Sequence, residues 1–100
     1  MPGWTMDQAG AAIRTAVATV EAVGTCSLDI RIADRRMTEA LDVLSAATAT
    51  LNPAQAEANR ARLLDAIDAA TALAHHYGKD ARTWAQPHLT RMGAIARNGA

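Results

Sequence analysis

The sequence of 100 residues contains no phenylalanine, one cysteine, three prolines and only three aromatic residues. The single cysteine, Cys26, excludes an intramolecular disulfide and a cysteine metal cluster, and we expect it to be a small half-buried residue rather than a reactive or dimer-linking thiol. Leucine, isoleucine and valine together contribute only 17 residues. A core with so few large side chains buries little apolar surface, so we expect a homo-oligomer, most simply a dimer, or burial against a partner protein.

Charge of either sign is not in excess, because ten basic residues balance ten acidic ones. Such a chain has no overall attraction for nucleic acid or for acidic lipids. Its first residues lack the basic and apolar regions of a signal peptide, and no segment has the roughly 18 apolar residues of a membrane span. We therefore expect a cytoplasmic protein with no membrane partner. Nine of the ten basic residues are arginine, which indicates a GC-rich bacterial or phage gene.

Alanine is abundant, at 25 of the 100 residues. It has the highest helix propensity of all residues, and its small side chain allows helices to lie close together. With zero net charge, repulsion does not oppose collapse of the chain. The composition therefore predicts a single all-α domain over residues 1–100. The expected architecture is a small antiparallel bundle of about four helices.

Local signals predict where the first helix begins and ends. The segment from Thr5 to Gln8 has the pattern of a capping box, in which a hydroxyl caps the first turn and a glutamine reaches back to it. Apolar residues at helical spacing follow, and Gly24 is a typical stop signal. We expect the first helix over about 6–23.

The segment that follows fits two patterns. Apolar and polar residues alternate over 26–32, which is typical of a strand. The same residues also begin a helical stripe that continues to Leu51. A lone strand would have no partner within the chain, so we favour a helix over about 28–51 with Ser27 as its N-cap. A helix that starts only at Asp34 is the alternative.

The third helix has the clearest start signal in the sequence. Asn52 is predicted to cap it, Pro53 suits the first helical position, and Gln55 completes a capping box. Gly78 is predicted to end it. The connection to the second helix is short, which predicts that these two helices are antiparallel neighbours.

The fourth helix contains a proline. Asp80 is predicted to cap this helix. Pro87 lies seven residues later, where it removes a backbone donor and clashes with the preceding turn. We expect the helix to kink there, or to break into pieces over 81–86 and 87–97.

The unusual side chains of the chain gather within residues 75–91, which contain every histidine, the only tyrosine, the only lysine and one of two tryptophans. Aromatic residues and arginine are enriched at protein interfaces. If the fourth helix is continuous, His88 lies on the same face as Trp84, four residues earlier. We therefore expect a partner-binding surface made by five residues, Tyr77, Arg82, Trp84, His88 and Arg91.

The leading functional prediction is a non-enzymatic protein–protein interaction module, such as a small adaptor, inhibitor or assembly component. The first alternative is a nucleic-acid-binding regulator that uses Arg31, Arg35 and Arg36, although acidic residues lie among these arginines. The second alternative is a ligand-binding or catalytic bundle with a pocket around Cys26 or a histidine. We predict no catalytic residue, no cofactor and no metal, because no motif of these kinds is present.

Overall fold

The computed structural model describes residues 2–98, and within this range it contains four α-helices and no strand. The all-helical class and the four helices are therefore confirmed. The helices are α1 (Pro2–Gly24), α2 (Ile30–Thr48), α3 (Pro53–Tyr77) and α4 (Lys79–Asn98). The predicted cap at Thr5 is wrong, since α1 already begins at Pro2.

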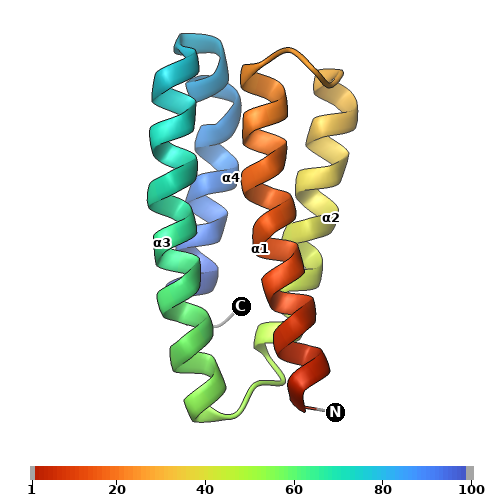
Figure 1. Cartoon of the computed structure of the whole chain (residues 1–100), viewed down its shortest axis with the longest axis vertical. Coiled ribbons are helices and arrows are strands. Elements are labelled where there is room, and N and C mark those ends of the chain that lie inside the picture. The colour runs from red at the N-terminus through yellow and green to blue at the C-terminus, as the bar shows by residue number, and fades with distance from the viewer. Residues whose placement is uncertain (1, 99–100) are drawn as a thin grey trace.

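The four helices lie side by side along the long axis of a bundle that measures 38 × 21 × 16 Å (Figure 1). The α1–α2 and α3–α4 connections lie at one end, and the α2–α3 connection lies at the other (Figure 1). Helix α1 packs against α2 and α3, and α4 packs against α3 and α2. The prediction that α2 and α3 are neighbours is wrong, because residues 49–52 carry the chain across the end of the bundle to a diagonal position.

Alanine dominates the core, as its abundance in the sequence suggested. Eleven of the nineteen buried apolar residues are alanines. The fully buried large apolar side chains are few: Val20, Met37, Leu41, Leu44, Leu63, Met92 and Ile95. Most of the close packing between helices is therefore made by methyl groups and backbone, and even a small added side chain at such a contact must displace a neighbour.

The α1–α2 connection is a helix C-cap of the Schellman type. The amide of Ser27 donates to the carbonyl of Ala22 at 2.9 Å, and the amide of Cys26 donates to that of Val23 at 3.2 Å. Cys26 has the left-handed φ of 57° that this motif requires at its turning residue. The predicted half-buried position of Cys26 is wrong, because the residue is exposed at this turn.

The second helix begins at Ile30, so the strand pattern over 26–32 is not realised. Its N-cap is Asp29, whose carboxylate accepts a hydrogen bond from the amide of Arg31 at 2.8 Å. The predicted cap, Ser27, is wrong, because it lies three residues before Ile30 and the N-cap position belongs to Asp29. The alternation of apolar and polar residues over 26–32 arises because the turn at the end of α1 is followed directly by the first residues of α2.

We expect Cys26→Gly to stabilise the protein by about 1 kcal/mol, because a non-glycine residue pays roughly this much in the left-handed region. Urea denaturation would measure the free energy of unfolding. Cys26→Ala is the matched control: it also removes the thiol but keeps the Cβ, and its stability should stay close to that of the parent. Equal stability of the two variants would show that the turn is not strained.

The start of α3 confirms the predicted capping box. The amide of Gln55 donates to Oδ1 of Asn52 at 2.9 Å, and the amide of Asn52 donates to Oε1 of Gln55 at 3.2 Å. Pro53 occupies the first turn, where its missing N–H costs nothing. All the partners lie within four consecutive residues, which is why the sequence alone was sufficient here.

Gly78 is the only residue between α3 and α4, with a φ of 104°. Its amide donates to Ala74, and its carbonyl accepts the amide of Arg82 at 3.0 Å. Gly78 thus ends one helix and begins the next, and the predicted cap Asp80 instead lies within the first turn of α4. Helix α4 is continuous through Pro87, so the predicted break is absent.

Candidate interaction surface

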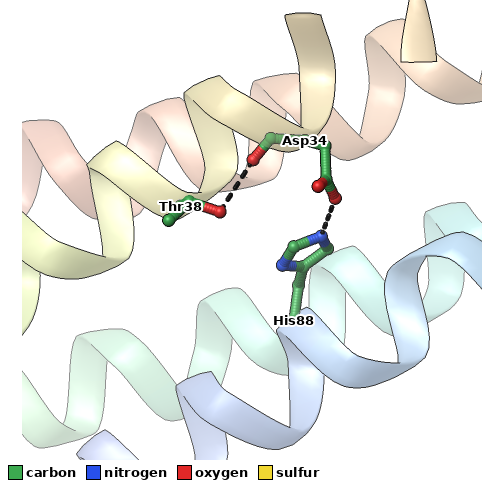
Figure 2. A network of polar contacts seen from close by, with 3 residues as sticks. All are labelled: Asp34, Thr38 and His88. Atoms are coloured by element: carbon green, nitrogen blue, oxygen red, sulfur yellow. Dashed lines mark hydrogen bonds and ion pairs between the residues drawn. The ribbon is translucent and has the colours of Figure 1, made fainter. Parts of the chain in front are cut away.

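Three of the five predicted surface residues lie together between α4 and α2. The rings of Trp84 and His88 are 4.9 Å apart, as expected if α4 is continuous. Nε2 of His88 lies 2.9 Å from Oδ1 of Asp34 on α2, and Arg91 donates to Oδ1 of Asp42 at 2.6 Å. Figure 2 shows the His88 ring pointing from α4 towards the carboxylate of Asp34. These contacts join two helices of the same chain.

The His88–Asp34 contact leaves little of the histidine available to a partner. Only 14% of the His88 side chain is exposed, against 61% of the Asp34 side chain. The Asp34 carbonyl also accepts the hydroxyl of Thr38, one turn further along α2 (Figure 2). Trp84 is half-buried and packs against the core. We therefore interpret these side chains as holding α4 against α2.

Tyr77 lies on a different side, at the end of α3 beside the end of α1. Its ring occupies the space where a side chain on Gly24 would be. It also contacts the neighbouring ring of His76 edge-on, with ring centres 4.9 Å apart. The five predicted residues are therefore divided among three places. Arg82 is the only one of the five that lies on the outer flank of the bundle where α3 and α4 meet.

That outer flank carries a groove with a volume of about 680 Å³. The single-residue turn at Gly78 positions it, because it places the last turns of α3 directly beside the first turns of α4. Nine residues line the groove: Thr71, Ala74, His75, Lys79, Arg82, Thr83, Gln86, Pro87 and Leu89. Most of the lining surface is apolar, and the groove is open to solvent.

The polar part of the groove has one sign of charge. Lys79 and Arg82 are both exposed, and neither forms an ion pair with another residue in the described part of the chain. His75 adds a third basic group, and no carboxylate is among the lining residues. Because the lining contains basic groups and no carboxylate, this rim can attract acidic groups.

The floor of the groove offers apolar contact, and Pro87 is among its lining residues. Ala74 is buried, and Leu89 is half-buried against the core. Pro87 has no N–H, so it cannot donate to the carbonyl of Thr83 one turn earlier in α4. The arrangement suits an amphipathic segment with apolar side chains towards the floor and acidic side chains towards the rim.

Sequence reasoning placed Arg82 in the contact surface but missed Lys79 and His75. Both lie within the 75–91 cluster that the sequence had indicated. The sequence does not show how α3 is aligned along α4. That alignment places His75 in the same groove as Arg82. Gly78 was the signal in the sequence that could have revealed this groove. When a new helix begins only one residue after the previous helix ends, the adjoining turns of the two helices must lie side by side.

The residues of the two alternative functions lie on α2, at the α1–α2 turn and in the α3–α4 groove. Arg31, Arg35 and Arg36 are exposed on α2, and Arg31 lies 3.6 Å from the carboxylate of Asp29. Cys26 is exposed at the α1–α2 turn and does not line the α3–α4 groove. A histidine, His75, does line that groove, and the other lining residues include no thiol and no carboxylate.

Within residues 2–98, no group of three or more histidine, cysteine or acidic side chains is arranged to hold a metal ion. None of the described helices is long and apolar enough to cross a membrane. Comparison with models of protein families, with curated proteins and with solved structures finds no match.

Proposed function

We propose that this protein is a non-enzymatic protein–protein interaction module that binds an acidic, amphipathic segment of another protein in the α3–α4 groove. The observation that carries the proposal is the groove itself, where an apolar floor is bordered by His75, Lys79 and Arg82 without a carboxylate. Charge complementarity of this kind selects acidic partners and speeds their association. An adaptor, an inhibitor or an assembly component would each need such a surface.

We also propose that the helices form an antiparallel bundle that associates with a second copy of itself. The thin alanine core supports this part of the proposal, since 100 residues with few large buried side chains gain little from burial within one chain. The acidic segment and the second copy are separate partners, and they require separate surfaces.

A set of three synthetic helical peptides tests the groove. The peptides share one apolar face, and their polar faces carry glutamate, serine or lysine. We expect the glutamate peptide to bind at least about tenfold more tightly than the serine peptide, and the lysine peptide not to bind. Amide chemical shifts of the ¹⁵N-labelled protein should change mainly between Thr71 and Leu89. Equal binding of all three peptides would overturn the proposal.

The double variant Lys79→Glu/Arg82→Glu should lose binding of the glutamate peptide and gain binding of the lysine peptide. The matched control is Arg31→Glu/Arg35→Glu, which changes the net charge equally at exposed positions on α2. This control should keep the preference for the acidic peptide. If both double variants lose binding to the same extent, the attraction is a property of the total charge and not of the groove.

A further inference from the structure

Four exposed residues of α2 form a stripe: Ile32, Arg36, Glu39 and Val43. Their spacings of four, three and four residues place them within about 60° of one another around the helix. Ile32 is 40% exposed and Val43 is 44% exposed, and both are among the four exposed large apolar residues of the described chain. The stripe therefore presents two apolar side chains with two opposite charges between them.

This stripe lies on the flank of α2 away from α4. The opposite flank is occupied, because Asp34 and Asp42 reach His88 and Arg91 there. Three of the stripe residues, Arg36, Glu39 and Val43, line a second groove of about 310 Å³ between α1 and α2, whose lining is mostly apolar. It is distinct from the α3–α4 groove and shares no residue with it.

The two charged residues of the stripe, Arg36 and Glu39, have no ion-pair partner in the part of the chain that the structure describes. They lie one turn apart and are both exposed. An unpaired cation and an unpaired anion beside exposed apolar side chains can satisfy each other across an interface.

The order of residues in the stripe is symmetric. Ile32 and Val43 lie equally far from a point between residues 37 and 38, and so do Arg36 and Glu39. When two such helices cross antiparallel about a two-fold axis through this point, Ile32 meets Val43 of the second copy. Arg36 meets Glu39 of the second copy, and each contact occurs twice. Self-complementarity of this kind is the defining property of a two-fold interface.

We propose that this stripe is the dimer interface of the protein, with a second copy of the chain as its occupant. The inference rests on the self-association proposed above and identifies the face that makes it. The apolar ends and the α1–α2 groove supply burial, and the two reciprocal Arg36–Glu39 pairs set the register. The interface leaves the α3–α4 groove open, so that dimerisation and capture of an acidic segment are independent.

Sedimentation velocity over a series of concentrations tests the interface. The parent protein should have the mass of a dimer. Arg36→Glu places like charges at both reciprocal contacts, and so does Glu39→Arg. Each single variant should therefore raise the dissociation constant of the dimer by at least about tenfold. A parent protein that is monomeric at every concentration would overturn the inference.

Mixing the two single variants gives the decisive result. When one chain carries Arg36→Glu and the other carries Glu39→Arg, opposite charges again face each other at both contacts. We expect the mixture to form a one-to-one heterodimer at concentrations at which each variant alone is mostly monomeric. Arg35→Glu, an equal charge change outside the stripe, should leave the parent dimer intact. Failure of the mixture to associate, or dissociation by the Arg35 variant, would contradict the proposed register.

These outcomes are distinguishable from those of the peptide experiment. A protein that binds the glutamate peptide as a monomer would refute the interface and support the groove. A protein that is dimeric but binds the three peptides equally would support the interface and refute the groove. Circular dichroism of each variant establishes that the helices remain folded.

Discussion

Gly24→Ala should lower the free energy of unfolding by about 2 kcal/mol, which corresponds to a fall in Tm of about 10 °C for a domain of this size. A Cβ built on Gly24 would overlap ring atoms of Tyr77 and lie 2.9 Å from the Cβ of Tyr77. The ring can rotate away, but the Cβ is attached to the backbone of α3. The ends of α1 and α3 would therefore have to separate, and this cost exceeds the gain of replacing glycine by alanine in a helix.

Gly93→Ala is the matched control for this substitution. A Cβ at Gly93 meets only Nη1 of Arg97, at 3.3 Å, which is the far end of a flexible side chain. The same chemical change should therefore stabilise the protein here by about 1 kcal/mol, through helix propensity alone. Thermal unfolding followed by circular dichroism measures both effects. A similar loss of stability in both variants would contradict the explanation by close packing.

A double-mutant cycle separates the contact from the general effect of the substitutions. Tyr77→Ala removes the ring that occupies the space beside Gly24. In that background Gly24→Ala should destabilise the protein by less than it does in the parent, because the ring atoms are gone and only the Cβ of residue 77 remains close to the added methyl group. The coupling energy between the two positions would then report the close approach of α1 and α3 directly.

Asn59→Ala should lower the free energy of unfolding by about 2–3 kcal/mol. Asn59 is 1% exposed, and together with Arg62 it connects α3 to α2 and α1. Its Oδ1 accepts Nη2 of Arg62 at 2.9 Å, and its Nδ2 lies 3.3 Å from the hydroxyl of Thr48 on α2. The same Nη2 also donates to the carbonyl of Met6 on α1.

The expected loss arises chiefly from Arg62, which remains after the substitution. Its Nε is already buried without a hydrogen-bond partner among the described residues. Removal of the Asn59 oxygen would leave a half-buried cation with one acceptor fewer. A buried group that loses its partner costs more than the bond itself contributes.

Arg62→Ala and the double variant Asn59→Ala/Arg62→Ala complete this cycle. The double variant should lose less stability than the sum of the two single variants, since no cation then remains to be satisfied. Urea denaturation measures all three. Arg60→Ala is the control, because Arg60 is exposed on the same helix and should change the free energy of unfolding by less than about 0.5 kcal/mol. Strict additivity would show that the network is not coupled.

Several features of the fold could be predicted because all their causes lie close together in the sequence. The capping box at Asn52 needs only a side chain and an amide three residues apart. Gly78 was recognisable as a helix end because it tolerates the positive φ that such an end requires. The position of Trp84 and His88 on one face followed from helical spacing once α4 was continuous, and their rings are in tilted contact.

Other features depended on partners that are distant in the sequence. Asp34 and Asp42 on α2 receive the side chains that were expected to meet another protein. The α3–α4 groove similarly depends on the register between two helices. Neither could be anticipated, because composition and periodicity show which face of a helix is apolar but not which helix covers it.

The number of helices, several of their ends and the small size of the core follow from the sequence alone, because helix propensity and capping act over a few residues. The order of the helices around the bundle and the division of the 75–91 cluster were settled by packing. The physical reason is that alanine faces are nearly alike, so the choice of neighbours falls to a few long-range contacts such as Tyr77 on Gly24.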